Sequence, residues 1–153
     1  MLPEKLTLSN KNSVMVVDSD SASASAIAGW LESLNYNIVV AHSAAEAIQL
    51  LHDIAFIGCS LDALLASYHP REATCCRILS EFRYEYPWAA AALMLDMDDI
   101  AINCWAKTRN IPVLHKPLQK EDIAGWLRGH VNAASRAKLP GIRRVDPAFA
   151  LPV

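Results

Sequence analysis

The stretch Val113-Leu114-His115-Lys116-Pro117 is the most informative part of the chain, because a short apolar run ends there in a charged residue. Pro112 lies at the start of this run, where a missing backbone N–H weakens a sheet least. We therefore expect a strand over residues 111–115. A similar run, Val14-Met15-Val16-Val17, ends in Asp18. Both runs are typical of buried parallel strands.

Apolar runs and helical stripes alternate along the rest of the chain. Further strands are expected at residues 38–41, 54–57 and 89–95. Between the strands, apolar residues recur at the spacing of amphipathic helices. These stripes are Ile27, Trp30, Leu31 and Leu34; Ala47, Ile48 and Leu51; Cys75, Ile78, Leu79 and Phe82; and Ile123, Trp126 and Leu127. Another helix is expected to begin at Asp98-Asp99, and residues 59–70 are expected to be irregular, with at most a helical turn.

Two of the expected helices have clear start signals. Asp20 precedes the first helix, and an aspartate there can cap free backbone N–H groups. Ser43 and Glu46 form a capping box before the second helix.

Five strands that alternate with helices across short connections indicate a parallel sheet with helices on both faces. The predicted class is α/β, of the flavodoxin-like type, with strand order 2-1-3-4-5. We expect an N-terminal extension over residues 1–12, one domain over residues 13–135, and a tail or linker over residues 136–153. In such a sheet, ligands bind beyond the carboxyl ends of the strands.

Composition excludes several classes of protein. The chain has 153 residues, of which 53% are hydrophobic and 20% charged, enough apolar surface for a substantial core. A formal net charge of −2 argues against nucleic-acid binding. No apolar run approaches the roughly 18 residues that span a membrane. The N-terminus does not resemble a signal peptide, so we expect a cytoplasmic protein with no membrane partner.

The cysteines predict neither disulfides nor a metal site. Cys59, Cys75, Cys76 and Cys104 are scattered, and no paired Cys-x-x-Cys motif occurs among them. We expect most of them to be small buried side chains in a reducing compartment.

Asp18 follows the first expected strand, and Lys116-Pro117 follows the last. This framework resembles the receiver domain of two-component signalling. The resemblance covers roughly residues 13–131, and the flank of Lys116-Pro117 is similar to receivers of hybrid sensor kinases. It implies a pocket in which carboxylates hold Mg²⁺ and one carboxylate accepts a phosphoryl group. It also implies a cis Lys116–Pro117 bond.

Several residues depart from the receiver pattern that the resemblance implies. Asp18 occupies the first acidic position, but the second is Ser19. The acceptor position aligns with Gly58, or with Cys59 after a slip of one residue. Asp96 stands where a hydroxyl would sense phosphate. Lys116 and Pro117 are intact. We therefore predict a degenerate phosphorylation pocket with no catalytic residue and with weak or absent Mg²⁺ binding, and we expect the protein not to be an enzyme.

Asp96 has two interpretations. It can join Asp18 and Lys116 in a permanent ion-pair network that replaces the phosphate-dependent contact. Alternatively, the three are solvated polar residues at strand ends, where ion pairs contribute little.

The preferred hypothesis is a receiver that acts as an interaction module without phosphorylation, binding a histidine kinase, an output domain or itself. The resemblance implies a homodimer or partner face made by the fourth helix, fifth strand and fifth helix, with Trp105 and Val113 as interface candidates. One alternative is a redox or small-molecule sensor with Cys59 beside the vacated pocket, its thiol activated by Lys116. Another is a receiver that is phosphorylated at an ectopic acceptor, Asp62.

Overall fold

Five parallel strands form a single sheet in the order β2-β1-β3-β4-β5. The computed structural model describes residues 12–59, 61–69 and 75–137, the last eight by their backbone alone. The strands are β1 (Ser13–Val17), β2 (Asn37–Ala41), β3 (Ala63–Ser67), β4 (Ala90–Leu95) and β5 (Val113–His115). The helices are α2 (Ser21–Ser33), α3 (Ala44–Phe56), α4 (Cys75–Glu85), α5 (Ile100–Thr108) and α6 (Lys120–Ala137). The predicted class and strand order are confirmed. Most of the predicted N-terminal extension and of the tail lies outside the described residues.

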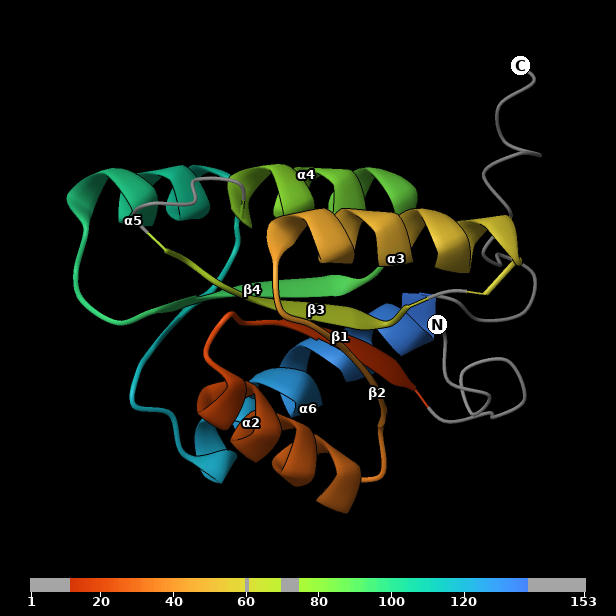
Figure 1. The fold of residues 1–153 in the computed structure, drawn as a ribbon, viewed down its shortest axis with the longest axis horizontal. Helices are drawn as coiled ribbons and strands as arrows, with labels where there is room; N and C mark the ends of the chain where they lie inside the picture. The colour runs from red at the N-terminus through yellow and green to blue at the C-terminus, as the bar shows by residue number, and fades with distance from the viewer. Residues whose placement is uncertain (1–11, 60, 70–74, 138–153) are drawn as a thin grey trace.

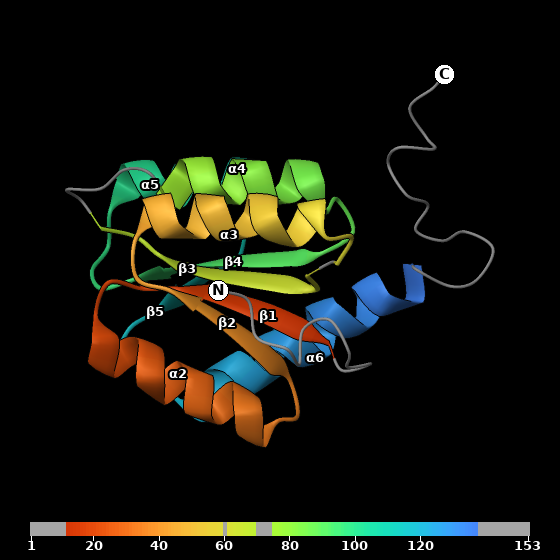
Figure 2. The same cartoon turned by 45° about the vertical axis from the view of Figure 1, so that its right-hand side comes forward.

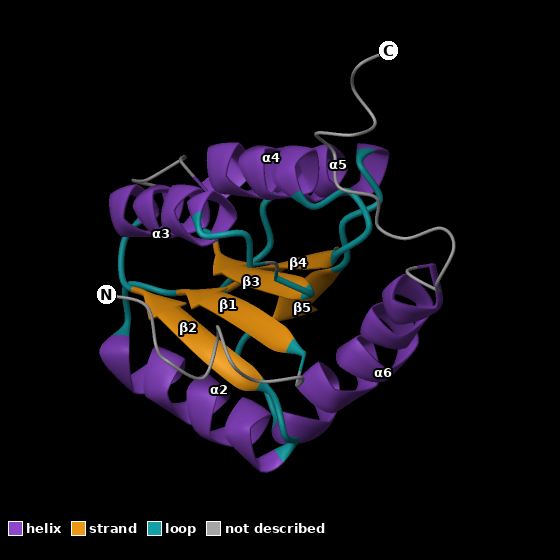
Figure 3. Ribbon diagram, turned by 90° about the vertical axis from the view of Figure 1, so that its right-hand side faces the viewer, coloured by secondary structure: helices purple, strands orange, loops and turns teal. Residues whose placement is uncertain are grey.

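The helices cover both faces of the sheet. Helices α3, α4 and α5 lie on one face, and α2 and α6 lie on the other (Figures 1 and 3). Figure 2 shows α6 running beneath the sheet toward its amino edge. Because the strands are buried between these layers, they carry apolar side chains toward both sides.

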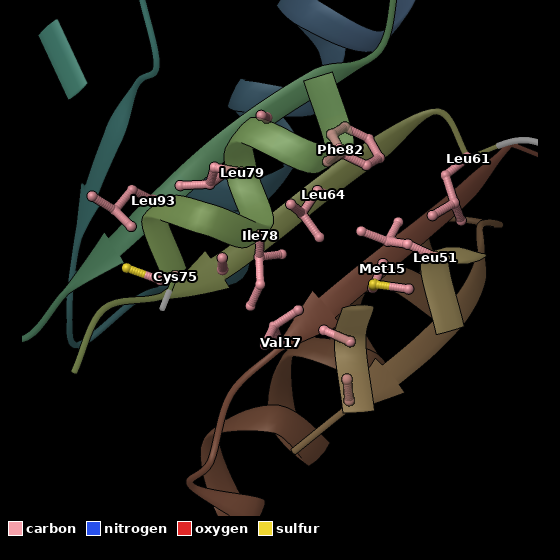
Figure 4. Close-up of a cluster of buried hydrophobic side chains, with 14 of the residues drawn as sticks. Met15, Val17, Leu51, Leu61, Leu64, Cys75, Ile78, Leu79, Phe82 and Leu93 are labelled. Atoms are coloured by element: carbon pink, nitrogen blue, oxygen red, sulfur yellow. The ribbon is translucent and has the colours of Figure 1, made fainter. Parts of the chain in front are cut away.

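Two hydrophobic cores result, one on each face. The upper core joins α3, α4 and α5 to alternate strand residues such as Met15 and Leu64. Figure 4 shows Ile78, Leu79 and Phe82 of α4 in this core. The lower core joins α2 and α6 to the intervening strand residues, and it buries Trp126 as predicted.

Strand β4 shows why an alanine-rich segment can be a central strand. Ala91 belongs to the upper core and Ala92 to the lower core, and both are buried. Alanine has little intrinsic preference for a strand. Here β4 is held by β3 on one side and β5 on the other, so its tertiary position decides its conformation.

The predicted helix starts are also confirmed. The Asp20 carboxylate accepts hydrogen bonds from the N–H groups of Ala22 and Ser23 at the start of α2. Ser43 Oγ accepts from the Glu46 N–H, and Glu46 in turn accepts from the N–H of His42. Asp99 caps α5 through the N–H of Ile102. Each cap satisfies a backbone donor that has no partner within its helix.

The third strand was predicted in the wrong place. Residues 54–57, predicted as a strand, form the last residues and the C-cap of α3, because Ile54 continues the buried stripe of Ala47, Leu50 and Leu51. Gly58 follows the helix with a φ of +81°, a conformation that glycine adopts readily. The third strand is Ala63–Ser67, within the segment that was predicted to be irregular. In the part of the chain that the structure describes, no helix is long and apolar enough to cross a membrane.

Candidate functional site at the carboxyl edge of the sheet

Asp18 is the centre of the carboxyl edge. It directly follows β1, its N–H donates to the carbonyl of Ala41 at 3.0 Å, and its side chain is 1% exposed. The ammonium Nζ of Lys116 donates to Asp18 Oδ2 at 2.9 Å. The other oxygen, Oδ1, accepts from the Asp20 N–H at 3.0 Å. Both oxygens of this carboxylate therefore have a protein partner.

Lys116 is positioned by the end of the last strand. Its backbone N–H donates to the carbonyl of Leu95 at the end of β4, at 2.7 Å. The Lys116–Pro117 bond is cis, as predicted. The Lys116 side chain is 14% exposed, so its ion pair with Asp18 is largely shielded from water. Charge interactions are stronger in such a shielded environment than in water.

Ser67 occupies the end of β3, next to Asp18. The register pairs Val17 with Ala66, which places Asp18 beside Ser67 at the carboxyl edge. A small cavity lies between these two residues, and its lining also includes His42, His69 and Cys75. Burial, together with the neighbouring Cys76, raises the pKa of the Cys75 thiol to about 12. This thiol is therefore protonated at neutral pH.

The residues of this edge do not fit a Mg²⁺ site. The ion needs several oxygen ligands in octahedral array, usually including carboxylates. Among the described residues, no group of three or more His, Cys, Asp or Glu side chains could hold a metal ion. Asp18 is already engaged, and its neighbours at the edge, Ser19 and Ser67, offer neutral hydroxyls. Weak or absent Mg²⁺ binding stays a prediction.

Comparison with solved structures identifies this architecture. A CheY-like response regulator receiver domain from Methanospirillum hungatei JF-1 superposes with a TM-score of 0.71 at 14% identity, over 83% of this chain and 98% of that one. A receiver domain from Clostridium thermocellum has a TM-score of 0.68 at 21% identity, over 83% and 97%. The chain has the receiver fold. A third match is the signal receiver domain of an HD domain-containing protein from Pseudomonas fluorescens Pf-5, with a TM-score of 0.70 at 20% identity, over 83% and 99%.

The sequence comparisons return nothing further. No protein-family model matches the chain, and no curated protein matches it. The structural comparisons therefore show that the chain has the receiver fold. At these low sequence identities they show nothing beyond the fold.

Within this receiver fold, Asp96 is not part of the ion-pair network. Its side chain is exposed, and no ion pair among the described residues involves its carboxylate. Only the Asp18–Lys116 pair of the predicted network forms. Asp96 instead lines a groove beside α2, together with Lys116 and Pro117.

Gly58, Cys59 and Asp62 lie at the opposite edge of the sheet from Lys116. All three precede β3, and Asp62 Oδ2 accepts from the N–H of Ser13 at the start of β1. Cys59 offers its carbonyl to the Tyr86 hydroxyl. Their predicted place in the pocket is therefore wrong, because it followed from the misplaced third strand. Lys116 is too distant to activate the Cys59 thiol, and a buried Asp62 is not poised to accept a phosphoryl group.

The predicted partner face consists of α5, β5 and α6. Trp105 and Val113 are half-buried and pack against the upper core. The guanidinium of Arg109 lies 4.6 Å from the centre of the Trp105 ring. Among the described residues near the start of α5, two large apolar side chains are exposed, Met97 at 70% in the loop after β4 and Ile100 at 83% in the first turn of the helix. Sequence reasoning did not single out these two residues.

Ser67 is the site residue that sequence reasoning missed. Two signals pointed to it. The buried stripe of α3 continues to Ile54, which excludes a strand at residues 54–57. The apolar run from Ala63 to Ala66 then ends in a polar residue, as β1 does at Asp18.

Proposed function

We propose that this protein is a receiver-fold interaction module of two-component or phosphorelay signalling that works without aspartyl phosphorylation. The observation that carries the proposal is Ser67 at the end of β3, where the family resemblance implies an acceptor carboxylate. A serine hydroxyl is a weak nucleophile unless a base removes its proton. A carboxylate needs no such base.

The state of Asp18 and Lys116 supports the same proposal. In the receiver chemistry implied by the resemblance, a lysine and a metal ion neutralise the incoming phosphoryl group. Here the Lys116 ammonium is already paired with the buried Asp18 carboxylate. The cation is therefore already paired within the protein.

The proposed partners are a histidine kinase, an output domain or a second copy of the chain. The first turn of α5 and the loop before it offer Ile100 and Met97 as exposed apolar contacts. Apolar side chains at the centre of an interface contribute most when they are fully desolvated by the partner. Ile100 stands in the first turn of α5, so it can be changed without disturbing either core.

The test is incubation with Mg²⁺ and acetyl phosphate, followed by intact-mass spectrometry. We expect no phosphoryl adduct on the parent protein. The matched control is a Ser19→Asp, Ser67→Asp variant, which restores two carboxylates at the edge beside Asp18 and Lys116. An adduct on the control alone supports the proposal, because the fold then needs only those acids. An adduct on the parent protein that hydroxylamine removes, as it removes an acyl phosphate, contradicts it.

A further inference from the structure

Three of the five large apolar side chains that are exposed among the described residues lie at the ends of α3 and α4. Phe56, the last residue of α3, is 91% exposed, and its C-cap Ile57 is 46% exposed. Tyr84, in the last turn of α4, is 86% exposed. Single exposed apolar side chains are normal on a protein surface, whereas a group of them commonly marks a binding surface. We call Phe56, Ile57 and Tyr84 the amino-edge patch.

The two aromatic side chains of the patch come from helices that run next to each other. His52 Nε2 of α3 lies 3.9 Å from Glu81 Oε1 of α4. Phe56 and Tyr84 stand one turn further along these same two helices, and side chains one turn apart share a helix face. The two aromatic side chains therefore occupy neighbouring positions at the amino edge of the sheet.

The surroundings of the patch are acidic. Both helices end there in backbone carbonyl groups that carry partial negative charge, and α3 has no basic residue in its last turn. Asp53 accepts from the neutral Gln49 side chain at 3.0 Å, so its charge is not neutralised by that contact. Glu85 is the last residue of α4, whereas Arg83 donates to backbone carbonyls at the end of α5. Two copies of the patch would bring like charges together, so a segment that is both basic and apolar is the better complement.

The chain itself contains such a segment. Residues 138–153 lie outside the described residues, and their sequence includes the cations Arg143 and Arg144 and the aromatic Phe149. Helix α6 ends at Ala137, at the same edge of the sheet as α3 and α4 (Figure 2). Packed layers lie about 10 Å apart, so the path around this edge from one helical layer to the other is on the order of 20 Å. The six residues from the end of α6 to Arg143 can span about 20 Å when extended.

We propose that the segment 138–153 binds the amino-edge patch of its own chain. Arg143 and Arg144 lie in the acidic surroundings of the patch, and Phe149 packs against its aromatic side chains. The bound segment shields the patch from other proteins and from a second copy of the chain. The proposal goes beyond the proposed function and stands independently of it, because the patch lies at the opposite edge of the sheet from Lys116.

The test is photo-crosslinking of the full chain with Phe149→p-benzoylphenylalanine, followed by digestion and mass spectrometry. We expect crosslinks from position 149 to the ends of α3 and α4, in a species with the mass of one chain. The additional changes Phe56→Ser and Tyr84→Ser together should lower the crosslink yield about fivefold, which corresponds to about 1 kcal/mol. Arg143→Gln with Arg144→Gln should also lower the yield, and so should added salt, because it screens exposed charges.

The matched control combines Met97→Ser with Ile100→Ser, which removes two exposed apolar side chains from the carboxyl edge. Its crosslinks should equal those of the chain that carries only the photo-crosslinker, with unchanged circular dichroism in all variants. The proposal is overturned by the absence of crosslinks, by crosslinks to another surface, or by an unchanged yield in the Phe56 and Tyr84 double variant. Crosslinks found only between two chains would also overturn it, because they would identify the patch as a contact between copies.

Discussion

Asp18 and Lys116 show how much a single residue pair can determine at the carboxyl edge. The carboxylate is almost fully buried and its cation is 14% exposed. Removing one partner of such a pair leaves an uncompensated buried charge. Replacing both removes the charge altogether, so the two changes should not be additive.

Lys116→Met should therefore lower the free energy of unfolding by about 3 kcal/mol. The double variant Asp18→Asn, Lys116→Met should be more stable than Lys116→Met alone. Urea unfolding at neutral pH, followed by circular dichroism, measures both. A double variant that is less stable than either single variant would show that the pair is not coupled as the geometry implies.

Cys75 should make stability depend on alkaline pH. Burial, the main cause, raises the pKa of its thiol from 9.0 to about 12. Below pH 9 the thiol is protonated in both the folded and unfolded states, so its contribution is fully present. Between pH 9 and about 12 only the unfolded state ionises, which lowers the free energy of unfolding.

In Cys75→Ala this free energy should fall less steeply with pH than in the parent protein. Equal slopes in the two proteins would contradict the assignment. Burial also raises the pKa of Tyr86. This residue is present in both proteins, so its effect on the slope cancels in the comparison.

At the scale of single elements, two glycines should respond to alanine in opposite directions. Gly29 lies inside α2 with open space around an added Cβ, whereas Gly58 follows α3 with a φ of +81°. Gly29→Ala should stabilise the protein by about 1 kcal/mol, because alanine favours a helix more than glycine does. Gly58→Ala should destabilise it by about 1 kcal/mol, because a side chain disfavours the left-handed region. Thermal melting of both variants checks the signs, and a stabilised Gly58→Ala would mean that α3 ends differently.

The elements also show where sequence reasoning succeeds and fails. The caps at Asp20 and Ser43 were predictable, because capping is a local contact between near neighbours. The third strand was misplaced, because its signals were ambiguous. Residues 54–57 are apolar and include two isoleucines, a pattern that suits either a strand or a buried helix. Ala63–Ala66 has the composition of a helix, and its pairing with β1 and β4 overrides that preference.

The candidate site was predictable to the same extent as its strands. Asp18 and Lys116 follow strands that were placed correctly, so their contact could be expected from topology alone. Ser67 was missed because its strand was misplaced. The outward direction of Asp96 was not predictable, because it depends on the path of the loop after β4.

At the scale of the whole molecule, the two cores share one sheet, so they should unfold together. Trp88 and Trp105 belong to the upper side, and Trp30 and Trp126 to the lower side. We therefore expect two double variants, each with one tryptophan pair replaced by phenylalanine, to report on separate faces. Within each variant, the midpoint of tryptophan fluorescence should coincide with that of far-UV circular dichroism during urea unfolding. Separate midpoints would show that one helical layer detaches first.

The ion pair at the carboxyl edge has a consequence for synthesis of the chain on the ribosome. Asp18 and Lys116 are 98 positions apart. The N-terminus of a nascent chain leaves the ribosome first. The carboxylate is thus made long before its cation. Until β5 has been translated and docked, any partly formed sheet holds a carboxylate without its counter-charge. Products that terminate before Lys116 keep this uncompensated carboxylate, so we expect them to be less stable than the finished domain.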